Sequence, residues 1–418
     1  MFNYNSNLNQ FYNDKVRLKD TDKSLIRRYK DKNINRIISG INSINQEENK
    51  SYPIPSFIEQ GSIAMSTTNQ SEDNAYDIDV AVIFPKDSIF NNPLEARKFV
   101  AKALNKNTAN DNAAVGHSSL ACNTSGACNV AVGTSALGAN TTGGNNAALG
   151  ANSLLANTTG ASNVSIGRNS LVANTTADFN VSVGTFSLTA NTTGEQNTAL
   201  GQQALTANTT ADNNTAVGSL SLLANTTGCD NTAVGESTLL VNTVGCRNVA
   251  MGNHALDANT TGDCNVGIGF GSLSAATTAD FNTMVGAAAG NDITTGASNT
   301  AVGALALSAN TTGCCNTAVG KDSLLANTTG HSNTAVGIAS LDSNTTGTVN
   351  QAFGRRSLCS NTTGDCNSAF GYFTLAANST GECNTAIGNS ALSANTTAGN
   401  NTAVGMGASI ANTTGGGN

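Results

Sequence analysis

The chain has 418 residues, with 20 Lys+Arg against 27 Asp+Glu and a formal net charge of −7. This acidic balance argues against a nucleic-acid-binding protein, because phosphate recognition needs clustered Lys and Arg. No segment approaches the ~20 apolar residues that span a bilayer, and residues 1–18 lack the apolar core of a signal peptide. We therefore expect a cytoplasmic protein that binds neither nucleic acid nor membrane.

The averages hide an abrupt change of composition near residue 106. Residues 1–111 hold 15 Lys+Arg, 14 Asp+Glu and all four prolines, whereas residues 112–418 hold 5 Lys+Arg, 13 Asp+Glu and all ten cysteines. A shift of this kind marks a boundary between parts that fold differently. We divide the chain into a segment at 1–106, a junction at 107–111 and a repetitive region at 112–418.

Two helices are predicted in the first segment. Residues 24–42 carry apolar side chains at helical spacing. Residues 91–106, NNPLEARKFVAKALNK, begin with Asn92 as a helix cap and Pro93 at the first helical position.

Between these helices stands the only pattern in the chain that indicates catalysis. An extended segment ends at a tight turn, Gly61-Ser62, and the stretch DIDVAVIF predicts an apolar strand that begins at Asp77. Asp77 and Asp79 share one face of this strand. Two such carboxylates can hold Mg²⁺, which neutralises a nucleoside triphosphate and activates an attacking hydroxyl. The Gly-Ser turn offers backbone N–H groups and a hydroxyl to phosphate oxygens.

The stretches GSIAMSTTNQ and YDIDVAVIF resemble the cGAS/DncV-like nucleotidyltransferases (CD-NTases) of bacterial anti-phage signalling. The resemblance covers roughly residues 1–106. It implies an α/β fold in which Gly61 and Ser62 contact nucleotide phosphates, while Asp77 and Asp79 are catalytic and bind two Mg²⁺ ions. Enzymes of this family make cyclic di- or trinucleotide messengers from nucleoside triphosphates.

The family pattern is incomplete in this chain. Such enzymes need a third carboxylate on a later strand, the rest of the central sheet and a helical lobe that closes over the base. Here the repeats begin where those parts should come. We interpret the segment as a truncated, inactive nucleotidyltransferase. The alternatives are a working Mg²⁺-dependent enzyme with the repeats as scaffold, or a chain that joins two unrelated genes.

Residues 112–417 form eighteen coils of 17 residues with the consensus N-T-A-V-G-x-x-S-L-x-A-N-T-T-G-x-x. The fifth-position Gly is present in all eighteen coils, and Leu holds the ninth position in sixteen. Seventeen residues are too few for a helix pair, and short β-branched runs bracketed by Gly and Asn favour strands. The predicted fold is therefore mostly β, a long parallel β-solenoid (β-roll) preceded by a partial α/β nucleotidyltransferase fold.

Within each coil we expect two short strands, at N-T-A-V-G and S-L-x-A, with the Val and Leu positions stacked inward. Phe353 and Phe370 replace Val in consecutive coils, as a stacked core pair would. Asn at a fixed place in every coil predicts a hydrogen-bonded ladder that satisfies backbone groups of the turns. The N-T-T triplets match glycosylation acceptors, but we interpret them as turn residues.

Eight of the ten cysteines stand at the two positions before the coil-opening Asn. Cys229 and Cys246 are one coil apart, as are Cys366 and Cys383, so each pair should stack at ~4.8 Å, within the Cα range of disulfides. One interpretation is a ladder of disulfides or metal ligands. The other, which a cytoplasmic location favours, is small residues tolerated at a turn. The spacing of Cys and His does not support a zinc site.

The motif NTAVGxxSLxANTTG resembles repeats of phage tail fibres and bacterial surface proteins and, distantly, the shorter coils of trimeric autotransporter adhesin heads. The resemblance covers residues 112–418. It implies a rod that forms a homotrimer or associates laterally, and it leaves a surface or virion location open. The predicted function is a structural, adhesive-type solenoid fused to an incomplete nucleotidyltransferase segment, with Mg²⁺ and nucleoside triphosphates bound only if that segment functions.

Overall fold

The structure is a computed structural model of the chain, and it describes residues 38, 39, 42, 46, 56–59, 80–83 and 112–417. The chain divides into two compact units, residues 1–111 and 112–418. In the first unit the described residues 38, 39, 42 and 46 are helical, and β1 (Ser56–Glu59) pairs antiparallel with β2 (Val80–Ile83). Within the described residues, no helix has the length and apolar character needed to cross a bilayer.

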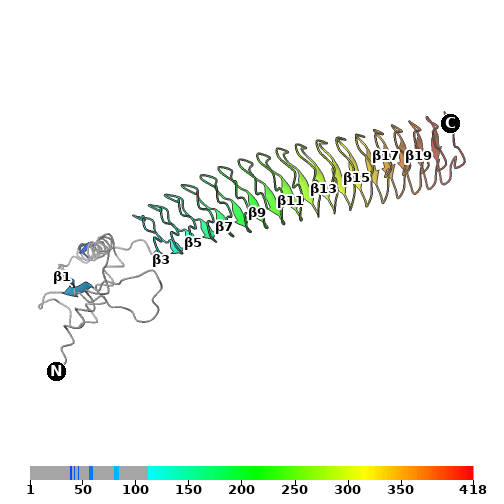
Figure 1. The fold of residues 1–418 in the computed structure, drawn as a ribbon. Helices are drawn as coiled ribbons and strands as arrows, with labels where there is room; N and C mark the ends of the chain where they lie inside the picture. The colour runs from blue at the N-terminus through cyan, green and yellow to red at the C-terminus, as the bar shows by residue number, and fades with distance from the viewer. Residues whose placement is uncertain are drawn as a thin grey trace, which may run out of the picture. The chain divides into compact units, whose positions relative to one another are not determined.

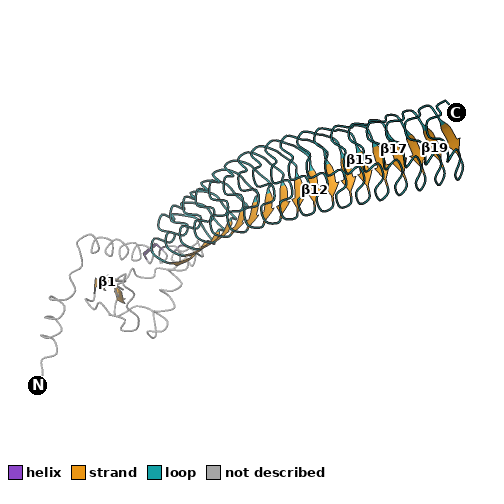
Figure 2. Cartoon of the chain, turned by 45° about the vertical axis from the view of Figure 1, so that its right-hand side comes forward, coloured by secondary structure: helices purple, strands orange, loops and turns teal. Residues whose placement is uncertain are grey.

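The second unit is a long parallel β-solenoid (Figure 1). It contains eighteen three-residue strands, and seventeen parallel pairings join each strand to the one in the next coil. Figure 2 shows the strands along one side of the rod and the turns around the rest. The strands are β3 (Ala113–Val115), β4 (Val130–Val132), β5 (Ala147–Leu149), β6 (Val164–Ile166), β7 (Val181–Val183), β8 (Thr198–Leu200), β9 (Thr215–Val217), β10 (Thr232–Val234), β11 (Val249–Met251), β12 (Val266–Ile268), β13 (Thr283–Val285), β14 (Thr300–Val302), β15 (Thr317–Val319), β16 (Thr334–Val336), β17 (Gln351–Phe353), β18 (Ser368–Phe370), β19 (Thr385–Ile387) and β20 (Thr402–Val404).

Each coil has one strand, so the prediction of a second strand at S-L-x-A is wrong. That segment forms turns, because the seventh and ninth residues take left-handed backbone conformations; Ser135 and Leu137 have φ of 58° and 50°. Another left-handed residue, Asn145 at 59°, stands at the seventeenth position of the same coil. Residues in this region of φ/ψ space reverse the chain and interrupt an extended run.

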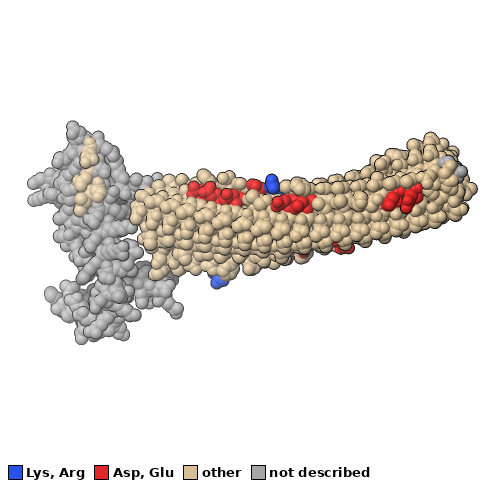
Figure 3. Space-filling view, turned by 90° about the horizontal axis from the view of Figure 1, so that it is seen from above, with Lys and Arg blue, Asp and Glu red and all other residues tan. Residues whose placement is uncertain are grey.

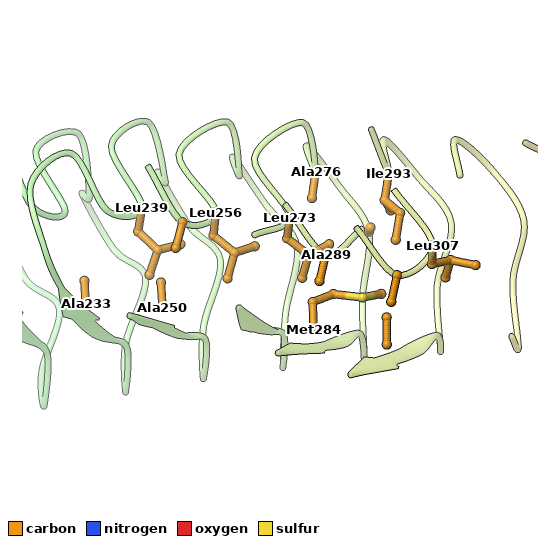
Figure 4. Packing of buried hydrophobic residues seen from close by; sticks show 14 of the residues in the cluster. Ala233, Leu239, Ala250, Leu256, Leu273, Ala276, Met284, Ala289, Ile293 and Leu307 are labelled. Carbon is orange, nitrogen blue, oxygen red and sulfur yellow. The ribbon is translucent and has the colours of Figure 1, made fainter. Parts of the chain in front are cut away.

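The interior of the rod is built from Ala and Leu, as Figure 4 shows for Ala233, Leu239, Ala250 and Leu256. The prediction that the Val position stacks inward is therefore wrong. Successive side chains of a strand point to opposite sides, and the middle residue, Ala, is the one that faces the interior. Leu from the opposite wall fills the remaining space, which leaves room for only a small side chain on the strand.

The ninth-position leucines combine a strained backbone with complete burial. Their φ angles lie between 48° and 56°, a conformation that costs an L residue about 1–2 kcal/mol. Leu154 and Leu188 are 0% exposed, and full burial of Leu contributes about 1.5–3 kcal/mol. Burial offsets the backbone cost, which explains why Leu rather than Gly stands at this position.

The predicted Asn ladder is confirmed, and a second one runs beside it. In the first, Asn163 Oδ1 accepts the N–H of Asn180 at 2.9 Å, while its Nδ2 donates to the carbonyl of Ala177 at 2.8 Å. In the second, Asn157 Nδ2 donates to Asn140 Oδ1 at 2.8 Å. These side chains are 0% exposed, so the Asn of N-T-T acts in the turn, as interpreted from the sequence.

The fifth-position glycine is required by both conformation and space. Gly201, for example, has a φ of 144°, and a Cβ there would lie 2.3 Å from the backbone oxygen of Gly218 in the next coil. L residues with a side chain rarely adopt such a conformation. Stacked glycines therefore let adjacent coils approach closely directly after each strand.

Candidate interaction surface

Gly61, Ser62, Asp77 and Asp79 lie outside the described residues, and their predicted roles stay predictions. The structure describes the strands beside them. β1 ends at Glu59, before the Gly-Ser turn, and β2 begins at Val80, directly after the D-x-D motif. The prediction that this apolar stretch forms a strand is confirmed for residues 80–83.

In the solenoid, the outward side of β3–β20 forms a continuous surface, here called the sheet face. It consists of the first and third residues of each strand, and none of these is charged or buried. The third positions hold large apolar side chains such as Leu149, Leu200 and Met251, which are 49%, 46% and 41% exposed. The first positions hold Thr in nine of the eighteen strands, so the sheet face carries one continuous row of apolar side chains beside a mixed row. A large exposed apolar patch on a protein marks an interaction site.

Charged residues gather at the two edges of the sheet face. We call the two positions before the coil-opening Asn the leading edge, and the sixth and seventh positions of each coil the trailing edge. Figure 3 shows acidic side chains gathered along one long edge of the rod. The leading edge holds eight acidic residues and one basic residue, and the trailing edge holds four basic and two acidic residues. On the leading edge these are Asp178, Glu195, Asp212, Asp230, Asp263, Asp280, Asp365, Glu382 and Arg247, and on the trailing edge Arg168, Lys321, Arg355, Arg356, Glu236 and Asp322.

Five of the eight leading-edge carboxylates also cap backbone groups of the preceding coil. Asp178 Oδ1 accepts the N–H of Ala161 at 2.6 Å, and Asp365 Oδ1 accepts the N–H of Thr348 at 2.6 Å. These bonds hold the acidic side chains in line along the rod. Each carboxylate keeps a second oxygen with which it can meet a cation.

Aromatic and guanidinium groups cluster at the trailing edge of two consecutive coils. The rings of Phe353 and Phe370 stack with centroids 4.9 Å apart and an interplanar angle of 5°. They stack on the outward side of β17 and β18, where they are 36% and 37% exposed, rather than in the core as predicted.

The same cluster holds two arginines against aromatic rings. The guanidinium of Arg355 lies 5.9 Å from the ring centroid of Tyr372, and that of Arg356 lies 5.5 Å from Phe373. Neither arginine forms an ion pair with another described residue. Arginine and aromatic residues are enriched where proteins meet partners.

Cys229 and Cys246 stack as predicted, without forming a disulfide. The Sγ atoms of Cys229 and Cys246 lie 3.1 Å apart, and all ten cysteines are free thiols. The hydrogen bond with the Cys246 thiol, followed by burial, raises the pKa of Cys229 to about 12. Burial is the largest cause of the raised pKa of Cys366, next to Cys383.

No metal centre accompanies these thiols. Throughout the part of the chain that the structure describes, no three His, Cys, Asp or Glu side chains stand close enough together to hold a metal ion. Protonated thiols are also poor ligands, because the thiolate is the form that binds metals.

The sequence reasoning missed the sheet face because it placed Val inside the rod. Two signals could have found it. The middle residue of the strand is the small one, and the positions on either side carry no charge in any coil.

Comparison with known families bears on the strand pair of the first unit. Residues 55–125 match the family described as "Cyclic GMP-AMP synthase DncV-like, nucleotidyltransferase domain". The match supports the resemblance seen at GSIAMSTTNQ and YDIDVAVIF, and it extends into the first coil of the solenoid. The comparisons with curated proteins and with solved structures gave no match.

Proposed function

We propose that the solenoid is a structural, adhesive-type rod that associates laterally through its sheet face. The observation that supports this most strongly is the absence of charge at both outward positions of all eighteen strands. Twelve large apolar side chains on this face are 36–68% exposed, and rows of exposed apolar side chains mark interaction sites. In this proposal the nucleotidyltransferase-like segment carries no activity.

The hydrogen-bonded interior suits the role of a rod. One buried Asn ladder runs through the coils, a second is interrupted only at Ala276 and Ile293 within the described rod, and the interior is filled mainly by Ala and Leu. Contacts in a solenoid connect only adjacent repeats, so adding coils lengthens the rod while each outward position recurs once per coil. When two rods associate side by side, a weak contact between two coils is repeated along the rod, and the contributions to binding add up.

Light scattering across a dilution series of the full chain tests this function. Leu200→Lys with Met251→Lys places four charges at each interface of two rods, and we expect it to abolish association. The matched control is Val241→Lys with Val244→Lys, which changes two equally exposed apolar residues (39% and 47%) off the sheet face. Equal association of both variants would overturn the proposal, as would a wild-type chain that stays single at every concentration.

A second candidate function is favoured by the family match at residues 55–125. It is a Mg²⁺-dependent nucleotidyltransferase that makes cyclic oligonucleotide messengers in anti-phage defence, with Gly61 and Ser62 at the phosphates and Asp77 and Asp79 at the metal ions. The test is incubation of the chain with nucleoside triphosphates and Mg²⁺. A cyclic product that is lost in Asp77→Ala supports this activity, and its absence under those conditions counts against it.

A further inference from the structure

We infer that the sheet face binds a second copy of this chain, parallel and in register, with a two-fold axis along the rod. The inference rests on the lateral association proposed above and adds the partner and its orientation. The outward side chains repeat once per coil along β3–β20. A partner keeps contact along the whole face only if its own surface has the same repeat, and a second copy has it.

The charges at the two edges select the orientation. Rotation by 180° about the rod axis sets the leading edge of one copy against the trailing edge of the other, coil against coil. Arg168 directly follows β6 and Asp178 precedes β7, so Arg168 lies within one coil of Asp178 of the second copy along the rod. Arg355 and Arg356 follow β17 and lie within one coil of Asp365 of the second copy, which precedes β18.

One coil reverses the sign of both edges together. Glu236 replaces a neutral or basic residue at the trailing edge, and Arg247 is the one basic residue on the leading edge of that same coil. The side chain of Arg247 is 63% exposed, and its Nη2 lies 4.0 Å from Oδ2 of Asp263 in the same chain. In the parallel pair Glu236, which follows β10, lies within one coil of both Arg247 and Asp230 of the second copy, so this coil by itself does not favour the parallel pair.

The antiparallel pair fails the same test. With two rods fully overlapped in opposite directions, the fourth coil faces the fifteenth, and like edges meet. Arg168 then meets Arg355, and Asp178 meets Asp365. Like charges placed opposite each other at an interface suppress an arrangement. Of the two ways to join the sheet faces, the charges favour the parallel one.

Sedimentation equilibrium of the full chain with charge reversals tests the pairing. Arg355→Glu with Arg356→Glu should raise the dissociation constant about 10-fold or more, since it reverses pairs on both sides of the two-fold axis. Asp365→Arg should do the same. The three changes combined should restore the dissociation constant to within about twofold of wild type.

The matched control is Lys321→Glu. Lys321 also stands at the trailing edge, but its Nζ is 2.7 Å from Asp322 Oδ2 of its own chain, and the leading edge of its coil holds no acid. It should leave the dissociation constant nearly unchanged. Circular dichroism of every variant confirms that these exposed substitutions leave the solenoid folded.

Arg168→Glu separates the two orientations. A parallel pair weakens, because the new carboxylate faces Asp178, and Asp178→Arg rescues it. An antiparallel pair tightens, because the repulsion from Arg355 is removed, and that result overturns the inference. Failure of the combined variant, Arg355→Glu with Arg356→Glu and Asp365→Arg, to restore binding, or a mass of three chains, overturns it as well. If Leu200→Lys with Met251→Lys abolishes association while the charge reversals leave the dissociation constant unchanged, lateral association is supported and this orientation is wrong.

Discussion

The sulfur of Met284 lies 2.8 Å from the point where a Cβ on Gly290 would stand. Gly290 occupies the ninth position, which carries an inward Leu in sixteen coils. Met284 and Ile293 are both 0% exposed and fill the space of the missing leucine side chain (Figure 4). One coil has thus exchanged Ala, Leu and Asn for Met, Gly and Ile while its interior stays filled, as close packing demands.

Restoring the consensus residues of this coil one at a time should lower the free energy of unfolding. Gly290→Leu alone should lower the free energy of unfolding by about 1–3 kcal/mol, because the new side chain overlaps Met284 and Ile293. Met284→Ala alone leaves a cavity and should cost about 2–5 kcal/mol. The triple variant, which adds Ile293→Asn to both, recreates the consensus coil and should recover most of the loss in urea unfolding. Additive losses in the triple variant would contradict this packing relationship.

The period of the solenoid, the fixed glycine and the Asn ladder could all be predicted from the sequence, because each is written as an exact 17-residue spacing. The inward residue of the strand could not. Alternation allows either Ala or its two neighbours to face inward, and only the space left by Leu from the opposite wall decides between them. The left-handed backbone of the ninth-position leucines, with φ near 50°, could not be predicted either. Local backbone preference excludes this conformation for Leu, and only burial in the folded rod overrides that preference.

Removing one member of the first Asn ladder should destabilise the rod strongly. Asn163→Ala deletes the acceptor of the Asn180 N–H and the donor to the Ala177 carbonyl, at 0% exposure. Buried groups left without partners cost about 1–3 kcal/mol each, so we expect a loss of about 2–4 kcal/mol in urea unfolding. Asn253→Ala, at the trailing edge, is the control and should change stability by less than about 0.5 kcal/mol. Similar losses for both variants would speak against the ladder.

The Cys229 thiol should resist deprotonation until very alkaline pH. Its pKa is raised to about 12, chiefly by the hydrogen bond with Cys246, from an ordinary value of 9.0. Between these two values the folded chain keeps a proton that the unfolded chain loses, so the contribution of this thiol to stability falls as pH rises. Alkylation by iodoacetamide, followed against pH by peptide mass spectrometry, measures the thiolate. Cys246→Ala should lower the pH at which Cys229 reacts; an unchanged profile would contradict the assignment.

Asp342 should cost stability at neutral pH. Burial raises its pKa, and its Oδ1 finds no hydrogen-bond partner in the described structure. The folded state therefore favours the protonated form, and stability falls as pH rises through the raised pKa. Asp342→Ser, the residue found at the equivalent positions 308 and 393, should raise thermal stability at pH 7 by roughly a few tenths of a kcal/mol, since solvent screens the group in part. The gain should vanish near pH 3, and a gain that persists there would point to another cause.

The candidate surface was less predictable than the fold. Its composition is visible in the sequence, as an uncharged second and fourth position in every coil, but its exposure depends on the direction of the strand residues. The complementarity of the two edges depends on the side of the strands on which each charge lies, as Arg168 after β6 and Asp178 before β7 illustrate. The roles of Asp77 and Asp79 rest on sequence alone, since the described structure begins again at Val80.

Side-by-side pairing of the rods is measured most directly by solution X-ray scattering, which gives the mass per unit length and the length of a rod separately. For the 42.1-kDa chain, an in-register pair doubles the mass per unit length as concentration rises, while the length of the solenoid stays constant. A mass per unit length that remains that of one chain at every concentration, with or without an increase in length, would contradict lateral association through the sheet face.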